Sequence, residues 1–555
     1  MTTLRPAKTV MRLSRLGSLH QCRLSFMRQL TRRMAREGWR FSRPVFEIND
    51  QGEGHAVYTA AGPERSYSLV AFAHDLPDHL RSDRVIAEAW DATFALFDGV
   101  PEAQDIDRLA ANVPLQEAGR VSERELSLSR ANRSVRLWAH VVAALADGRQ
   151  PDVEQIDRVG YLMRTTAVYG SGKFGAADRD RIADRAEMSS PFQAEMLSVY
   201  LTRAFVRDLV EHIAGAKGGD KAVPLDRALA ERLGIGNSTG LGMAPFLINH
   251  PLLLNNWIMA RERAIATVRG LVSAEPEAVA GFRTLLHRAA HSVENWHSEH
   301  PIQVQKLADL RADTARLTAH LEQNDLTSGR PWDKLMIWAE TALTLEGQEW
   351  LASLILEPYA DLVDGFGTTM DDPDPEAFHI DGTRSLGAVR DLLEARFGWA
   401  GRVDWSARDA IARAWYVSEE KLEPRLGERF EEPIADYEQP LAPARDAARA
   451  LADMAGWDAD QPIAAFLLGH PEHRHTLRRT LIGEAAPYSE ILDNTIASDV
   501  LPIDMLRAKL SFFGATRFDP RSDRWVRIAM YTGAPYPADL SEENADLWVY
   551  PEGAS

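Results

Sequence analysis

Cysteine, lysine and long apolar runs are scarce in this sequence of 555 residues, and two of these shortages exclude whole classes of protein. The single cysteine, Cys22, cannot form a disulfide within the chain, and it excludes a zinc or iron–sulfur site built from several cysteines. No apolar run reaches about 18 residues, so no segment is predicted to span a membrane. These absences predict a cytoplasmic protein in a reducing compartment.

Charge is abundant but unevenly divided along the chain. The sequence holds 63 basic and 81 acidic residues, a net charge of −18, yet residues 1–45 contain eleven arginines or lysines and one acidic residue, Glu37. The first 45 residues are therefore a strongly basic arm on an acidic body. An acidic body disfavours nucleic acid as the main partner, because contacts with phosphate provide most of the affinity for nucleic acids.

The basic arm is expected to form a helix over residues 19–38. Met27, Leu30 and Met34 recur at helical spacing, and Gly38 stands where a helix C-cap belongs. The composition also fits a transit peptide, binding to anionic lipid or contact with RNA. We favour docking of the arm onto the acidic body or onto a second subunit, because charge asymmetry most often reflects solubility and association.

The spacing of apolar residues predicts a mainly α protein, a multi-helix globular assembly with two short β regions. Alternating segments over residues 44–76 indicate an antiparallel meander, and a further strand is expected at 525–530. Helices are expected over residues 82–99, 191–214 and 251–270. The expected divisions are a basic arm (1–43), a small antiparallel β segment (44–80), a main helical domain (81–366), an acidic linker (367–384), a second helical region (385–500) and an irregular or β tail (501–555).

The stretch GSGKFG at residues 170–175 matches the dinucleotide-binding fingerprint G-x-G-x-x-G in its letters. That fingerprint requires a strand before its first glycine, whereas residues 153–167 have the apolar spacing of a helix. The stretch also fails as a Walker-type phosphate loop, because Phe174 stands where a hydroxyl group is needed. We therefore expect a glycine turn between two helices and no dinucleotide or other cofactor.

Such a turn still has groups that suit an anion. Backbone amides near a helix start bind anions, and Ser171 and Lys173 would lie beside them. The chain has only eight lysines against 55 arginines, so a lysine within a glycine turn is unusual here. Lys173 is accordingly a candidate for holding an anion and for moving a proton. The plain alternative is that the glycines only allow two buried helices to turn tightly.

A second glycine cluster, residues 234–251, is expected to form a partly buried loop. It carries Asn237, Ser238 and Thr239 and is poor in charge, so its polar groups need partners. Those partners are either the backbone of the loop itself or a bound ligand. His250 is the candidate acid–base residue, because imidazole titrates near neutrality; its alternative role is to cap the helix that begins at Pro251.

Arg203 and Arg207 lie one turn apart on the expected helix 191–214, which is apolar on nearly every face. Buried arginines need anionic partners. We favour Glu195 and Glu211 of the same helix as these partners. The alternative is a carboxylate or phosphate of a substrate, held in bidentate fashion.

Two groups of histidines have spacings that resemble those of metal ligands. His287, His291 and Glu294 share one face of an expected helix, and the stretch HPEHRH at 470–475 contains three more histidines. The first group does not fit H-E-x-x-H, and its surroundings are polar. No metal site is predicted.

These features favour a cytosolic enzyme that acts on a small anionic metabolite, a carboxylate or phosphate, by acid–base hydrolysis or elimination in a pocket among helices. The expected catalytic residues are His250 and Lys173. The expected substrate-binding residues are Ser171, Arg203, Arg207, Asn237, Ser238 and Thr239. The alternative is a non-catalytic helical scaffold or regulator that self-associates through its basic arm. The expected partners are a small anion and further copies of the chain, with no specific nucleic acid.

Overall fold

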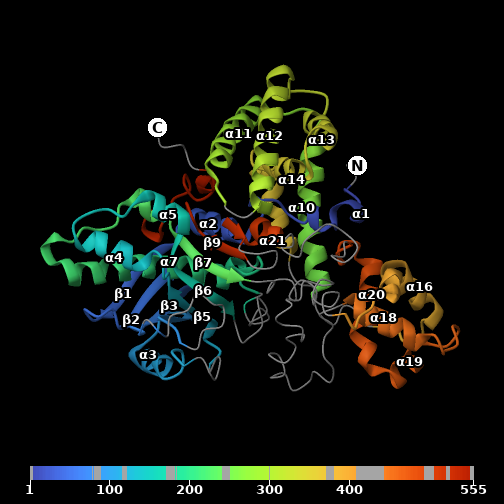
Figure 1. Ribbon diagram of the computed structural model, residues 1–555, viewed down its shortest axis with the longest axis horizontal. Coiled ribbons are helices and arrows are strands. Elements are labelled where there is room, and N and C mark those ends of the chain that lie inside the picture. Colours follow the sequence, from blue (N-terminus) through green and yellow to red (C-terminus); the bar gives the residue numbers. More distant parts are fainter. Residues whose placement is uncertain are drawn as a thin grey trace.

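A nine-stranded mixed β-sheet organises the molecule, and a large group of helices is inserted between two of its strands (Figure 1). The computed structural model describes residues 4–19, 21–77, 79, 89–115, 122–169, 182, 184–239, 250–298, 301–370, 380–407, 443–492, 506–520 and 526–550. Helices are in the majority, but the sheet makes the fold α+β. The predicted majority of helix and the two β regions are confirmed, but the class mainly α is wrong, because both β regions join in one large sheet.

Six strands form an antiparallel meander that begins directly after the basic arm. They are β1 (Arg40–Ile48), β2 (Gly54–Ala61), β3 (Ser66–Ala73), β4 (Ala92–Asp98), β5 (Glu125–Arg133) and β6 (Tyr161–Tyr169). The predicted meander at 44–76 is confirmed as β1 to β3. The helix expected over 82–99 is wrong where the chain is described, because β4 lies there. Its residues are buried on both faces, and periodicity does not distinguish such a strand from a buried helix.

The meander changes to parallel pairing at its sixth strand. β7 (Gly234–Thr239) lies parallel to β6, and helix α7 (Gln193–Gly218) belongs to the connection between them. Beyond β7 the sheet continues with β9 (Val526–Met530) and ends with β8 (Ala515–Pro520), which pairs antiparallel with β9. The helix predicted at 191–214 and the strand predicted at 525–530 are confirmed as α7 and β9.

The helix expected over residues 153–167 is wrong in its second half. Helix α5 (Val153–Val159) ends at Gly160, whose φ of 78° is the left-handed conformation that terminates helices. The chain then extends as β6, where the β-branched residues of RTTAVY favour a strand. A strand therefore does precede GSGKFG, and the absence of one is no argument against a dinucleotide site. Residues 170–181 lie outside the described part of the chain, so the expectation of no dinucleotide site at GSGKFG stays a prediction.

Two layers of helix cover the sheet. Helix α7 packs across β2 to β7 on one face, with α4 (Trp138–Ala146) alongside it, and α3 (Ala103–Ala110) lies on the other. The alternation of β3 fits this arrangement, since Leu69 belongs to the core beneath α7 and Val70 to the core beneath α3. The central strands β3 and β4 are thus buried on both faces, whereas the edge strand β1 is largely exposed.

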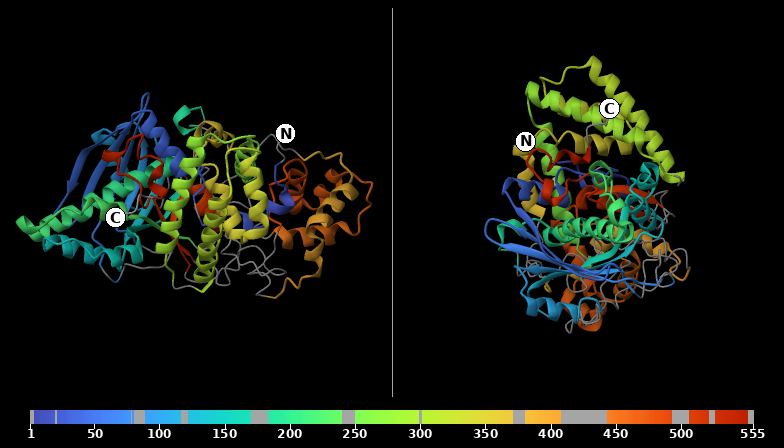
Figure 2. Two further views of the ribbon diagram at one scale, coloured as in Figure 1. Left: turned by 90° about the horizontal axis from the view of Figure 1, so that it is seen from above. Right: turned by 90° about the vertical axis from the view of Figure 1, so that its left-hand side faces the viewer.

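The inserted helices form two groups, which follow the sheet along the long axis of the molecule (Figure 2). The first group comprises α10 (Pro251–Arg269), α11 (Pro276–Asn295), α12 (Pro301–Gln323), α13 (Pro331–Ala342), α14 (Leu345–Leu354) and α15 (Ala360–Val363). The second comprises α16 (Leu386–Phe397), α18 (Pro443–Met454), α19 (Ile463–Gly469) and α20 (Arg474–Ala485). The predicted helix at 251–270 is confirmed as α10. None of the described helices has the length and apolar character needed to cross a membrane.

Shorter helical segments connect these elements. They are α1 (Ala7–Val10), η1 (Leu13–Arg15), η3 (Ala186–Met188), η4 (Gly219–Lys221), α8 (Arg227–Glu231), η5 (Asp364–Met370), η7 (Gly398–Arg402), η9 (Pro471–His473), α21 (Leu506–Ala508), η11 (Lys509–Phe513), η12 (Pro537–Asp539) and η13 (Leu547–Val549).

The basic arm docks onto the acidic body of the same chain. Helix α2 (Phe26–Arg36) is followed by Gly38 in the left-handed conformation, as predicted. Arg28 donates 2.6 Å hydrogen bonds to Glu357 and Asp546, and these carboxylates come from the end of the first helical group and from the C-terminal segment. The arm therefore ties the two ends of the chain to the helical insertion.

Arg5 makes the same kind of contact nearer the N-terminus. Its guanidinium group donates to Glu262 at 2.7 Å and to Glu349 at 2.8 Å, and both carboxylates are fully buried. Arg15 adds a second cation at 3.1 Å from Glu349. These arginines form ion pairs with carboxylates of the same chain. Docking of the basic arm onto the acidic body therefore explains why charge is divided unevenly along the sequence.

Candidate functional site

The carboxyl ends of β6 and β7 lie side by side at one edge of the sheet, and each strand is followed directly in the sequence by a glycine. β6 ends at Tyr169, directly before GSGKFG, and β7 ends at Thr239, directly before Gly240. Thr165 lies opposite Asn237 in the parallel register, so the two strands end side by side. Ligands of α/β sheets commonly bind at the carboxyl ends of parallel strands, because the connections that follow meet there.

Part of the predicted site falls outside the described residues. Ser171 and Lys173 lie in the stretch 170–181, and residues 240–249 also lie outside. The roles of Ser171 and Lys173 stay predictions.

A buried lysine contacts Asn237 at this edge. Lys509 Nζ donates a hydrogen bond of 3.3 Å to Asn237 Oδ1, and the two residues are 1% and 6% exposed. Lys509 begins η11, a π-helical turn that directly follows α21, between the sheet and helix α10 (Figure 1). Turns of this type are rare and frequently occur at functional sites.

The surroundings of Lys509 change its acidity. Burial lowers the pKa of the Lys509 ammonium group from 10.5 to about 7. A large fraction of the side chain is therefore a neutral amine near neutral pH, able to accept a proton. In its charged form the same group would favour an anion beside it, because an ammonium ion is poorly stabilised away from water.

Aromatic rings enclose the far end of the turn. The ring centroid of Phe513 lies 4.7 Å from that of Phe192 and 5.2 Å from that of Phe26, and Phe512 lies 5.7 Å from Trp257 of α10. Such a cluster keeps water from the turn. It explains in physical terms why burial dominates the acidity of Lys509.

The backbone at Phe192 is strained. Its φ of 59° lies in the left-handed region, which a bulky residue adopts at a cost of about 1–3 kcal/mol. Phe192 immediately precedes α7, and its ring packs on Phe26, Trp257 and Phe513. Strain of this kind gathers at ligand sites and active sites, where the surrounding packing maintains it.

Asn237, Ser238 and Thr239 lie in strand β7, so the expectation that they form a loop is wrong. Gly236 explains part of the error, because a Cβ atom there would stand 2.6 Å from the ring of Tyr161. The glycine serves close packing between strands rather than a turn. The backbone of Ser238 lies opposite Arg527 of β9.

Ser238 also lies at the centre of a sequence motif found in hydrolases. Residues 236–240 match G-x-S-x-G, which in hydrolases puts a nucleophilic serine on a sharp turn between strand and helix. Ser238 instead has the extended backbone of a paired strand. The match therefore does not identify a nucleophile.

His250 occupies the residue before α10, which has Pro251 in its first turn. Its side chain is half-buried and does not cap the helix through a hydrogen bond. Helix α10 reaches the aromatic cluster near Lys509 two turns later, through Trp257. The acid–base role of His250 stays a prediction.

Arg203 lies at the opposite end of β7 from Asn237. Its guanidinium group donates to backbone carbonyls, at 2.7 Å to Leu233 and 2.6 Å to Ala534, and it stacks over the ring of Tyr536 at 4.0 Å. Leu233 and Asn237 are four residues apart, which is about 13 Å along a strand. The structure therefore does not bring Arg203 to the edge where Lys509 lies.

Arg207 accompanies Arg203 at that amino end. It pairs with Asp208 at 3.1 Å and lies over the Tyr536 ring at 4.4 Å, while Glu211 accepts a hydrogen bond from the backbone of Leu225. The close partners described for the two arginines are thus carbonyls and a neighbouring aspartate, and the expected partner Glu211 adds a longer-range attraction that helps to raise the pKa of Arg207. Their substrate-binding role stays a prediction.

Lys509 is the residue that the sequence patterns did not single out. One signal was available: it stands in AKLSFFGA, where a single charge is surrounded by apolar residues. Among only eight lysines, one placed in such a stretch is a candidate for burial and for a shifted pKa.

The stripe of His287, His291 and Glu294 is exposed on α11. Within the described part of the chain, the side chains that gather metal-ligating atoms are a different set, on the second helical group.

Comparison with known proteins assigns no family: no protein-family model matches the chain, and neither a curated protein nor a solved structure matches it.

Proposed function

We propose that the protein is an enzyme that binds a small anionic metabolite, a carboxylate or a phosphate, at the carboxyl ends of β6 and β7, and that Lys509 transfers a proton there. The observation that carries this proposal is the contact of the buried Lys509 amine with Asn237 at that edge. The location matches the common ligand position of parallel strands.

The chemistry of a buried amine favours an acid–base reaction. A neutral lysine near pH 7 accepts a proton from a substrate or from a water molecule, which is the role of the base in an elimination or hydrolysis. The ammonium group formed would be stabilised by the negative charge of the bound ligand. Asn237 would hold the amine in position through its amide oxygen.

The surroundings support the same proposal. The aromatic cluster excludes water, so charges at the site interact strongly. The strained residue Phe192 and the π-helical turn fall beside the same lysine, and both features are frequent at functional sites.

The alternative of a scaffold that self-associates through the basic arm has less support. Arg5, Arg15 and Arg28 of the arm are already bonded to buried or half-buried carboxylates of their own chain. We therefore give priority to the enzyme hypothesis.

A thermal-shift screen tests the proposal with the full chain. The probes are inorganic phosphate, oxalate, succinate, citrate and adenosine monophosphate, applied to the wild type, Lys509→Met and Lys217→Met. Lys217 is an exposed lysine at the end of α7, so its replacement is a matched control for the loss of one positive charge.

The proposal predicts that at least one probe stabilises the wild type and Lys217→Met but not Lys509→Met. A probe at a hundred times its Kd should contribute about 2.7 kcal/mol. A stabilisation that persists in Lys509→Met, or a flat response of the wild type to every probe, would contradict it.

A further inference from the structure

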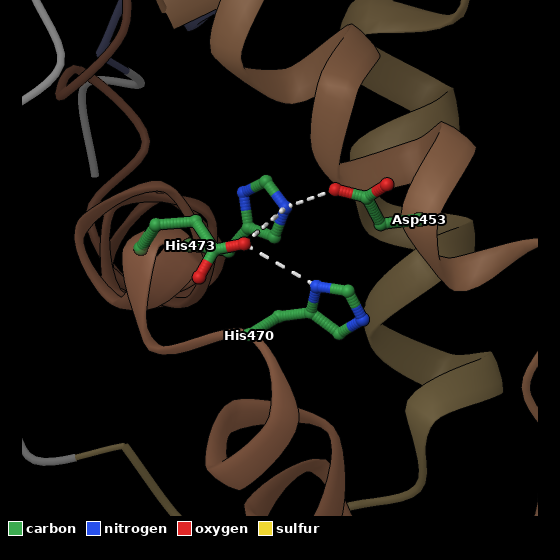
Figure 3. A group of neighbouring side chains, drawn as sticks. Asp453, His470 and His473 are labelled. Carbon is green, nitrogen blue, oxygen red and sulfur yellow. Dashed lines mark hydrogen bonds and ion pairs between the residues drawn. The ribbon is translucent and has the colours of Figure 1, made fainter.

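A group of two histidines and two carboxylates lies in the second helical group, apart from the site at β6 and β7. Asp453 comes from the end of α18, and His470, Glu472 and His473 come from the turn between α19 and α20. Figure 3 shows the carboxylate of Asp453 reaching toward His473, with the ring of His470 turned toward the same space. One ligand atom from each of the four residues lies within 4.8 Å of all the others.

The spacing of these atoms is close to what a metal ion needs. His473 Nε2 lies 2.7 Å from Asp453 Oδ2 and 4.0 Å from Glu472 Oε1, and His470 Nδ1 lies 3.3 Å from the same Glu472 oxygen. Ligand atoms around a tetrahedral zinc ion, with bonds of about 2.0–2.1 Å, stand roughly 3.3 Å apart. Small rotations of exposed side chains therefore suffice to surround an ion.

The ring positions are fixed by packing rather than by the ligands alone. The rings of His470 and His473 stack against Phe466 of α19, with centroids 4.9 Å and 5.8 Å away. Trp457 contacts the His470 ring from the side. His473 is buried, whereas Asp453 and Glu472 are exposed, so the group is rigid on its inner side and open to an ion from solvent.

The donor set indicates which ion fits. Two imidazole nitrogens and two carboxylate oxygens suit zinc and neighbouring divalent transition metals, whereas calcium and magnesium prefer oxygen ligands alone. We propose that Asp453, His470, Glu472 and His473 bind one divalent transition-metal ion, zinc being the best match. The ion would fasten α18 to the turn between α19 and α20. This proposal is independent of the function proposed for Lys509.

Metal binding to the untagged full chain, first stripped with a chelator, tests the proposal. Zinc is titrated in competition with a chromophoric chelator, and bound zinc is counted by elemental analysis, with magnesium as the comparison ion. The test variants are Asp453→Asn and Glu472→Gln, because both side chains are exposed and their replacement leaves the packing of the helices intact. The matched control is the double variant His287→Ala/His291→Ala, which removes two exposed histidines from α11.

The proposal predicts one zinc ion per chain in the wild type and in the control. Each test variant should bind zinc at least about tenfold more weakly. Excess magnesium should not displace the zinc. Absence of zinc binding in the wild type, equal affinity in the test variants, or loss of binding in the control would each overturn it.

Discussion

Lys509 Nζ donates a 3.3 Å hydrogen bond to Asn237 Oδ1, so a residue from the C-terminal part of the chain meets the strand that follows α7. The two residues are separated by 272 positions, and most of the helical insertion lies between them. Return of the chain to the sheet as β8 and β9 brings them together. The site therefore depends on the whole fold.

Replacing Lys509 with methionine should change how stability depends on pH. Between pH 7 and about 10 the unfolded chain holds a proton on Lys509 that the folded chain has released, so wild-type stability rises with pH in this range. Lys509→Met should therefore be more stable than the wild type at or below pH 7. That advantage should shrink by about 1.4 kcal/mol per pH unit above it.

Urea unfolding at several pH values from 6.5 to 9.5 measures this difference, with Lys217→Met as the control. A gap between the wild type and Lys509→Met that is constant across the range would show that the lysine titrates at its ordinary pKa.

Arg203→Met should strongly destabilise the fold. The carbonyls of Leu233 and Ala534 would lose their donor inside the protein, at a cost of about 3 kcal/mol or more. Arg207→Met removes a partly exposed guanidinium group and should cost less than about 1 kcal/mol. Free energies of unfolding in urea compare the two, and equal effects would mean that the carbonyl contacts of Arg203 contribute little.

Asp546 should make docking of the arm sensitive to acid. Burial alone would raise the pKa of its carboxyl group, but the guanidinium groups of Arg28, Arg32 and Arg23 outweigh burial and hold the pKa well below its usual range. The stability from this group is fully present above about pH 4, the ordinary pKa of an aspartate, and it is lost progressively as the pH falls below that value toward the folded pKa.

Asp546→Asn should accordingly cost about 3 kcal/mol at pH 7, because the three arginines lose a common partner, and it should flatten the acid dependence. Urea unfolding from pH 6 to 3 measures both effects, and protease cleavage within residues 4–45 reports release of the arm. Asp147→Asn, in an exposed ion pair, serves as the control and should change stability by less than about 0.5 kcal/mol. An unchanged acid dependence in Asp546→Asn would contradict the account of the arm.

Gly236→Ala should destabilise the pairing of β6 and β7. The added Cβ would stand 2.6 Å from the Tyr161 ring, and overpacking of this kind costs about 1–3 kcal/mol. Tyr161→Ala in the same chain should recover part of the loss, because the two sites then couple through the space freed. Free energies of unfolding in urea measure the two single variants and the double variant. If the two destabilisations simply add, the Cβ at position 236 and the ring of Tyr161 are not in contact.

The sequence correctly predicted those helices and strands whose residues show a clear apolar spacing or a terminating glycine. Alternation identified the meander β1 to β3, helical spacing identified α7 and α10, and Gly38 marked the end of the helix in the arm. The charge asymmetry correctly indicated docking of the arm. Each of these features depends on neighbours within a few residues or on the sum of charges.

The predictions that were wrong concern features that depend on residues far away in the chain. β4 is buried on both faces, so the apolar pattern of its sequence predicted a helix. Pairing with β5 and β7 helps to make β6 a strand. The grouping of Arg203 with Asn237 came from nearness in sequence, yet a strand separates them in space. Lys509 was missed because its significance comes from burial beside Asn237.

The most direct test of the account is the ionisation of the Lys509 side chain. Nuclear magnetic resonance of the full chain with carbon-13 at the lysine ε position follows all eight lysines as the pH is raised, and Lys509→Met assigns the signal of interest. The account predicts one resonance that titrates near pH 7 and is missing from Lys509→Met. Titration of every lysine above about pH 9.5, near the ordinary value for this side chain, would contradict it.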